Sequence, residues 1–180
     1  ISERIAHDII SILYLCHQKK RQMAYEQLQL QNQLCFRLYA ASRLITQAYE
    51  PYLMPLGITY TQYLVLMVLW EHDEQPVNDI GKKLLLGINT ISPLIKRMEK
   101  YGLLSRRNSP DDKRKQIVFL TDKGKELREK CASIPQCMLG DIDDCGIKPE
   151  CMMAIVPVLD NIIKGLNRKV ATNLKERRRK

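Results

Sequence analysis

Six cysteines are the residues of this chain that could carry redox chemistry, and they stand at positions 16, 35, 131, 137, 145 and 151. Cys35 lies in the stretch LCFRLYAASR, beside an apolar stripe and four residues before Tyr39. A thiol reacts as its thiolate, so a reactive cysteine needs neighbours that stabilise the anion. A free cysteine can equally be a small buried hydrophobe, and the stretch alone leaves both interpretations open.

The cysteine spacing indicates neither a disulfide framework nor a metal site. The cysteines are dispersed along 180 residues, whereas small secreted domains held by disulfides are dense in them. Cys131, Cys137, Cys145 and Cys151 form no close CxxC pairs, and the three histidines are scattered. We therefore expect free thiols in a reducing compartment and no metal or other cofactor.

Composition and charge describe a globular protein with a possible anionic partner. The chain is 45% hydrophobic, enough to bury a core, and its net charge is +9. The apolar run IISILYLC is far shorter than the roughly 20 residues of a membrane span, and its basic cluster follows it rather than precedes it as in a signal peptide. We expect no membrane partner and a cytoplasmic location.

Spacing and turn residues predict a mostly α fold with a small β-hairpin wing. The apolar spacing from Leu34 to Ile45 predicts a helix with one stripe facing a core. Pro51 and Pro55 break this helix, and Thr59 is the predicted N-cap of the apolar helix QYLVLMVLWE that follows.

The centre of the chain has the order of a winged helix-turn-helix. PVNDIGKKLLL and GINTISPLIKRMEKYG are typical of two short helices with a tight connection, and LLSRRNSPDDKRKQIVFLT alternates as a hairpin that ends at Thr121. Residues 81–115 contain ten Lys or Arg against three acids. A lone charge run is usually solvated surface, but charge concentrated on this pattern favours DNA.

Four ordered motifs resemble the organic-hydroperoxide-responsive branch of MarR-type winged-helix regulators: LCFRLYAASR, LGITYTQYLVLMVLWE, ISPLIKRMEKYGLLSRR and DDKRKQIVFLTDKG. The likeness runs from about Gln31 to Pro135. It implies a bacterial homodimer that represses by binding a pseudo-palindromic double-stranded DNA operator. It also implies release when an organic hydroperoxide oxidises the cysteine of the N-terminal helix. The chain has Gly87-Ile88-Asn89-Thr90 where the branch commonly has Asp-Ser-Gly-Thr, which puts the operator half-site and the helix cap in question.

Pattern and resemblance together divide the chain into four segments. They are an N-terminal extension (1–30), a dimerisation helix with the sensing cysteine (31–60), the winged helix-turn-helix (61–122) and a C-terminal helical dimerisation region with a basic tail (123–180). Thr121, just before the last segment, is the predicted cap of its first helix. Within the segment Pro135 interrupts the helix, and Ile155 to Leu166 have helical apolar spacing. Apolar helices at both ends suggest packing across a twofold axis.

The DNA contacts follow from the resemblance and from side-chain chemistry. The side chains expected in the major groove, on a helix from about Asn89 to Lys100, are Asn89, Thr90, Ser92, Lys96 and Arg97. The side chains expected on phosphates are Lys82, Lys83, Lys96, Arg106 and Arg107. Arg97 is the expected base-reading residue. Arg114 resembles the family arginine that enters the minor groove, and Asp112 is expected to hold its geometry.

For the redox site, the resemblance assigns the Tyr49 and Tyr60 hydroxyls as hydrogen-bond donors to the Cys35 thiolate, and Tyr39 as a packing residue over the thiol. Oxidation gives a sulfenic acid that condenses with a second thiol. That thiol is either a low-molecular-weight one or a cysteine of the partner subunit in the helix after the wing. Cys137 lies nearest that place, and Cys131 is the alternative.

Other functions remain open at this point. A MarR-type regulator could respond to a phenolic or other small ligand, with Cys35 a structural residue. A thiol peroxidase needs an arginine and threonine constellation that the chain does not show around Cys35, so we expect no enzymatic activity. A structural scaffold leaves the wing and its charge unexplained.

Overall fold

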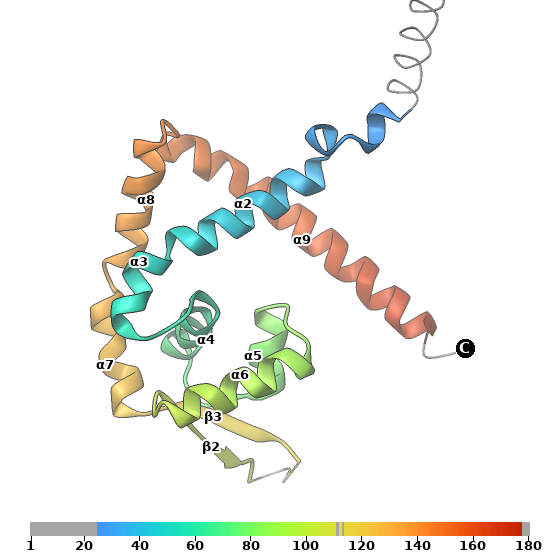
Figure 1. Cartoon of the computed structure of the whole chain (residues 1–180). Coiled ribbons are helices and arrows are strands. Elements are labelled where there is room, and N and C mark those ends of the chain that lie inside the picture. The colour runs from blue at the N-terminus through green and yellow to red at the C-terminus, as the bar shows by residue number, and fades with distance from the viewer. Residues whose placement is uncertain (1–24, 111, 113, 178–180) are drawn as a thin grey trace, which may run out of the picture. The chain divides into compact units, whose positions relative to one another are not determined.

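The computed structural model describes residues 25–110, 112 and 114–177, most of them helical (Figure 1). The chain divides into two compact units, one ending at Tyr49 and one beginning at Glu50. Outside the described residues lie the expected N-terminal extension up to Ala24, Cys16, Asp111, Lys113 and the tail from Arg178.

The unit that ends at Tyr49 is helical. Two short 3-10 turns, η1 (Glu26–Leu28) and η2 (Leu30–Asn32), precede α2 (Leu34–Ala48). The predicted helix is confirmed, but none of the residues of α2, all of which are described, is buried. The stripe from Leu34 to Ile45, expected to face a core, is exposed. An amphipathic helix buries its stripe only against a second apolar surface, and the described residues of this unit supply none.

The chain remains helical around the two prolines that follow α2. Pro51 lies in the first turn of α3 (Glu50–Leu53), where a backbone N–H would have no helical partner anyway. Pro55 lies in the 3-10 turn η3 (Met54–Leu56). The predicted break after α2 is confirmed, and its form is a series of short helical turns.

The core is built around α4 (Tyr60–Glu71). Its start is fixed by a capping box, in which the Thr59 hydroxyl accepts from the Gln62 N–H while the Gln62 side chain accepts from the Thr59 N–H at 2.8 Å. Val65 and Leu66 are fully buried, and buried residues occur on several sides of the helix. A helix covered on several sides is apolar on several sides, which explains the continuous apolar run in its sequence.

α5 (Val77–Lys83) and α6 (Ile88–Lys100) form the predicted helix-turn-helix, and α6 lies beside the hairpin in Figure 1. Their connection is tight, because the Leu86 N–H donates to the Gly81 carbonyl at 2.8 Å and a Cβ at Gly81 would meet the Leu86 oxygen at 3.0 Å. Leu85, inside this turn, has a left-handed φ of 55°. The residues that α6 buries are Ile91, Leu94, Ile95 and Met98.

Three short antiparallel strands form the wing. β2 (Leu104–Asn108) and β3 (Gln116–Leu120) are the predicted hairpin. β1 (Gln75–Pro76) pairs with the other edge of β3, which gives the order β1-β3-β2. The sequence does not predict β1, because two residues are too few to show the alternation of a strand.

α7 (Asp122–Cys131), α8 (Ile134–Asp144) and α9 (Pro149–Arg177) complete the described chain. The predicted cap is confirmed, since the Thr121 hydroxyl accepts from a backbone N–H in the first turn of α7 at 3.2 Å. Pro135 lies in the first turn of α8, so the predicted interruption is also confirmed. α9 is 29 residues long and leaves most of its large apolar side chains exposed.

No single helix in the described part of the chain is long and apolar enough to cross a membrane. One bent pair, Leu34–Leu56 with Tyr60–Glu71, matches a span by length and composition only. The second half of that pair contains α4, whose apolar residues are those of the core.

Gly124 marks a close approach between α7 and the chain that leaves α6. A Cβ at this position would lie 2.0 Å from the Leu103 carbonyl oxygen, so backbone would have to move. We predict that Gly124→Ala lowers the free energy of unfolding by about 2 kcal/mol or more. Urea unfolding followed by circular dichroism measures this change.

Gly140, in α8, is the matched control. A Cβ there meets no atom within 4 Å. Gly140→Ala is therefore expected to raise the free energy of unfolding by about 0.5 to 1 kcal/mol, because alanine loses less backbone entropy in a helix. Equal destabilisation by both substitutions would contradict the close approach at Gly124.

Candidate functional site

α6 presents the polar face expected in the major groove. Four of the predicted side chains, Asn89, Thr90, Lys96 and Arg97, are exposed, and Ser92 is half-buried. Gly87 precedes the helix and gives it no side-chain cap. Glycine has no side chain with which to accept from the first turn, so α6 begins without the capping hydrogen bond that stabilises many helices. The opposite, buried face of α6 fixes the polar face on a rigid support.

Arg114 and Asp112 are in contact at the tip of the wing. The Arg114 backbone N–H and Nε donate to Asp112 Oδ1 at 3.0 and 3.3 Å. The Arg114 side chain is 93% exposed, whereas that of Asp112 is 29% exposed. The carboxylate therefore orients the arginine and leaves its guanidinium in solvent.

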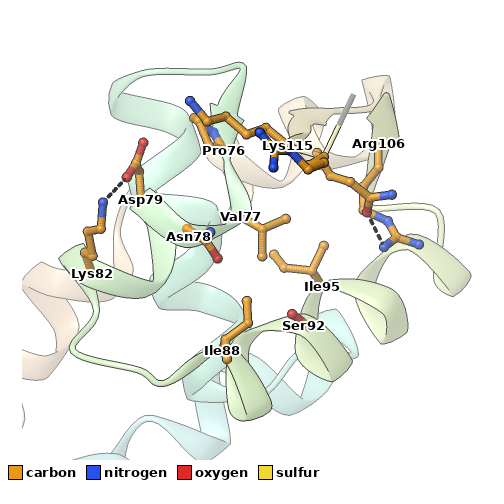
Figure 2. A pocket seen from close by; sticks show the side chains of 12 residues that line it. Pro76, Val77, Asn78, Asp79, Lys82, Ile88, Ser92, Ile95, Arg106 and Lys115 are labelled. Atoms are coloured by element: carbon orange, nitrogen blue, oxygen red, sulfur yellow. Dashed lines mark hydrogen bonds and ion pairs between the residues drawn. The ribbon is translucent and has the colours of Figure 1, made fainter. Parts of the chain in front are cut away.

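A groove of about 510 Å³ lies between the starts of α5 and α6 and the wing. Figure 2 shows Val77 and Ile95 directed into it, and Lys115 on the side of the wing. Lys82, from α5, and Arg114, from the wing, also line it, so cations approach the groove from both sides. This arrangement suits a polyanion that rests on α6 and the wing together.

Two neighbouring arginines of β2 bind acids of their own chain. Arg106 Nε and Nη2 lie 3.0 and 2.5 Å from Glu99 Oε2, on α6. Arg107 Nη2 lies 2.5 Å from Glu74 Oε2, and the Arg107 guanidinium carbon is 5.6 Å from the centre of the Phe119 ring. Both arginines were expected on phosphates. Neither acid could be predicted from the sequence, because no spacing pattern shows which cation the folded hairpin brings to it.

Three residues assigned to the redox site lie in the first unit. Cys35 and Tyr39 are one turn apart on α2 and both are exposed, while Tyr49 is half-buried at the end of the helix. Tyr60 belongs to the second unit, where it begins α4. Burial raises the pKa of Tyr60 above the ordinary value of a phenol, so at neutral pH its hydroxyl keeps its proton and can donate a hydrogen bond.

The two candidate resolving thiols have different environments. Cys131 is buried at the end of α7, and this burial raises the pKa of its thiol. Cys137 is exposed on α8. One turn further along α8, the Asp141 carboxylate accepts from the Tyr52 hydroxyl at 2.8 Å, and this hydrogen bond raises the pKa of Tyr52. Tyr52 and Asp141 carry no motif and were missed by sequence analysis.

The sequence is similar to proteins of one family. The sequence model of the MarR family matches residues 58–115 of this chain. Over 116 residues, the chain is 46% identical to the organic hydroperoxide resistance transcriptional regulator of Bacillus subtilis strain 168, and the aligned part covers 64% of this chain and 79% of that protein. The chain belongs to the MarR family. Its resemblance to the hydroperoxide-responsive branch is confirmed, and it is a transcriptional regulator.

Two solved structures have the same fold as this MarR-family chain. AbfR of Staphylococcus epidermidis is 39% identical, with a TM-score of 0.64, and the match covers 81% of this chain and 99% of that one. A structure of reduced AbfR bound to DNA is 39% identical, with a TM-score of 0.63, and covers 78% of this chain and 97% of that one. The predicted fold class, mostly α with a small winged sheet, is confirmed.

In the folded MarR-family chain, we expect Cys137 to react with iodoacetamide well before Cys131. The raised pKa of Cys131 leaves a smaller fraction of its thiol as the reactive thiolate at a given pH, and burial restricts access. Labelling of Cys131 should become faster only at a pH above the ordinary range of a thiol, because its pKa is raised. Timed labelling with peptide mass spectrometry measures both rates. In urea the two rates should converge, and equal rates in the folded protein would contradict the assignment.

Proposed function

We propose that this chain is a DNA-binding repressor that senses organic hydroperoxides through Cys35 and then releases its operator. The observation that carries the proposal is the exposed thiol of Cys35 on α2, in a chain similar to a regulator named for organic hydroperoxide resistance. The polar face of α6 and the wing supply the DNA-binding surface. We place the repressor in the bacterial cytoplasm.

DNA binding is divided between α6 and the wing. Arg97 can bind guanine with two hydrogen bonds in the major groove, and Asn89 can bind adenine in the same way. Lys96 meets phosphate, which makes the affinity dependent on salt without reading sequence. Arg114, exposed and oriented by Asp112, enters the minor groove, where narrow A·T tracts concentrate negative potential.

Operator binding requires two copies of the chain. The apolar stripe of α2 and apolar side chains of α9 such as Ile155 and Ile163 are exposed in the single chain, and a second copy would cover them. Segments 31–60 and 123–180 then form the dimer interface. A homodimer with twofold symmetry places two copies of α6 in successive major grooves, roughly 34 Å apart on a pseudo-palindromic operator.

The sensing step is a two-electron oxidation of Cys35. The thiolate sulfur attacks one oxygen of the peroxide, the O–O bond breaks, and the alcohol leaves with a proton from solvent, so that the sulfur becomes a sulfenic acid. Tyr49 and Tyr60 donate hydrogen bonds that favour the thiolate, and Tyr39 packs over the sulfur. Apolar side chains on α2 such as Phe36, which is 37% exposed, favour an organic peroxide over hydrogen peroxide.

A second thiol traps the oxidised sulfur. Its sulfur attacks the Cys35 sulfenic acid, forming a disulfide with loss of water. Cys137 is the better protein candidate, because it is exposed, whereas the buried Cys131 would lose its packing in order to react. A low-molecular-weight thiol is the other possible partner, and it would leave a mixed disulfide on Cys35.

Oxidation can switch DNA binding only if it has different free energies in the bound and released forms. A disulfide or a bulky adduct on α2 alters the helix that carries the dimer interface. Since both copies of α6 must meet grooves at a fixed spacing, a shift of a few ångströms between the subunits prevents simultaneous docking. The affinity then falls to that of a single half-site.

The groove beside the wing favours one alternative function. Its volume of about 510 Å³ and its mixed apolar and cationic lining would also suit a phenolic or other small anionic ligand, with Cys35 a structural residue. Such a ligand would release wild type and Cys35→Ser alike, whereas a hydroperoxide sensor loses its response with the thiol.

Cumene hydroperoxide is expected to release the reduced wild-type protein from DNA and to leave Cys35→Ser bound. The serine hydroxyl has nearly the size of the thiol but cannot be oxidised by peroxide under these conditions. Fluorescence anisotropy with DNA selected by the protein from a random-sequence pool measures the release. Cys131→Ser, which keeps the sensing thiol, is the control and should respond like wild type. Equal release of wild type and Cys35→Ser contradicts the proposal.

Mass spectrometry of the oxidised protein should show a Cys35–Cys137 disulfide between two chains. Cys137→Ser should instead stop at the sulfenic acid or, with added cysteine, form a mixed disulfide, because no other exposed thiol is supported by a motif. On non-reducing electrophoresis, oxidised wild type should run as a covalent dimer, and oxidised Cys137→Ser should not. A covalent dimer that persists in Cys137→Ser and disappears in Cys131→Ser would reverse the assignment.

A further inference from the structure

One arginine fastens the wing to α6. From Nε and Nη2, Arg106 donates to Glu99 Oε2 at 3.0 and 2.5 Å, and from Nη1 it donates to Gln116 Oε1 at 2.8 Å. The guanidinium of β2 is thereby joined to α6 and to β3. The side chains of Arg106 and Glu99 are only 26% and 33% exposed, so their ion pair is partly shielded from water.

We propose that Glu99, acting through Arg106, is a positioning residue for DNA binding. It fixes the wing at the angle to α6 that lets Arg114 and the polar face of α6 contact DNA together. Arg106 then serves as an internal link and not as a phosphate contact. The inference rests on the proposed DNA-binding function.

The register of the hairpin explains why Arg106 can bind β3 and α6 at the same time. Arg106 lies opposite Val118, which is fully buried, and Gln116 is on the same face of the sheet two residues away. The planar guanidinium fork can therefore bind an amide of β3 and a carboxylate of α6 at once. Charge-assisted hydrogen bonds of this kind are stronger and more directional than neutral ones.

Arg107 has a weaker link on the opposite face. It pairs with Glu74, and the two side chains are 53% and 55% exposed, so solvent screens this ion pair. Of the two links, the one from Arg106 is the better shielded, and it is the one that reaches α6.

The Arg106–Glu99 ion pair lies where a small tilt of the wing moves its tip by several ångströms. Arg106 lies on β2 (Figure 2), whereas Arg114 lies in the turn beyond it, and both line the groove between the wing and α6. A strand rises about 3.3 Å per residue, so five residues of β2 span roughly 16 Å, and a tilt of about 10° moves the tip by roughly 3 Å. Such a shift is enough to withdraw an arginine from a minor groove about 6 Å wide.

The charge of Glu99 and its positioning role predict opposite changes in DNA affinity when Glu99 is replaced. Removal of a carboxylate from a DNA-binding face strengthens DNA binding if electrostatics alone decides, because DNA is a polyanion. Removal of the positioning link weakens it. The sign of the change in affinity therefore separates the two explanations.

The experiment compares the affinity of reduced Glu99→Ala, Glu99→Gln and wild type for DNA selected by the wild-type protein. We expect about tenfold weaker binding by Glu99→Ala and a smaller loss for Glu99→Gln, whose amide oxygen can still accept from Arg106. Asp79→Asn is the matched control, since it removes one negative charge beside the wing, and with it the 2.7 Å ion pair to Lys82, without touching the link. It leaves Lys82 available for phosphate and should bind DNA as tightly as wild type or tighter. Thermal unfolding establishes that each variant is folded.

A double-mutant cycle with Arg114→Ala tests the mechanism. If Glu99 acts by placing the wing tip, Arg114→Ala should cost much less affinity in the Glu99→Ala background than in wild type. Arg106→Ala should weaken binding without lowering the salt dependence by the unit expected for a lost phosphate contact. Tighter binding by Glu99→Ala, or additive effects of the two substitutions, overturns the inference. Failure of wild type to bind any selected DNA would instead overturn the proposed function.

Discussion

Thr121 joins three elements at the root of the wing. Its hydroxyl donates to the Gly102 carbonyl at 2.6 Å, and its backbone N–H donates to the Leu103 carbonyl at 3.3 Å. The same hydroxyl oxygen accepts from the Gly124 N–H at 3.2 Å. Gly102 follows α6, Thr121 follows β3 and Gly124 lies in α7, so all three elements share this anchor. The orientation of the wing relative to α6 begins here, and Gly124 must lack a side chain because the Leu103 carbonyl lies so close to it.

The core helix α4 reaches the same anchor from the other side. Trp70 Nε1 donates to the Gly124 carbonyl at 3.0 Å, and Asp73 Oδ1 accepts from the Leu120 N–H at 3.0 Å. The root of the wing is therefore fixed by α4 and the turn after it, by α6 and by α7, whereas the Arg114 side chain at the tip is 93% exposed and is oriented by Asp112. Rigidity at the root and exposure at the tip suit a surface that must be presented at a fixed angle and yet meet a ligand.

Local features of the fold could be predicted from the sequence, and distant contacts could not. The caps at Thr59 and Thr121 depend on residues three positions away, so a short motif contains the whole interaction. The partner of Arg107 lies 33 residues away and that of Tyr52 lies 89 residues away. No pattern in the sequence shows which acid each of them meets. The folding of the hairpin brings Arg107 to Glu74, and the placement of α3 beside α8 brings Tyr52 to Asp141. The expected burial of α2 fails for a related reason, since periodicity identifies an apolar face but not the surface that covers it.

The placement of the redox residues bears on how oxidation could be passed to the DNA-binding unit. Cys35 lies in the unit that ends at Tyr49, and α3 begins at the next residue. The Tyr52 hydroxyl ties α3 to α8 through Asp141, and α8 also carries Cys137. Under the proposed chemistry, a Cys35–Cys137 disulfide would join α2 to α8 of the partner subunit, whereas the Tyr52–Asp141 hydrogen bond ties α3 to α8 of its own chain. In a symmetric dimer each copy of α8 would thus receive the disulfide from one chain and the hydrogen bond from the other. Since only two residues separate α8 from α7, a change at α8 lies close in the chain to the anchor at the root of the wing.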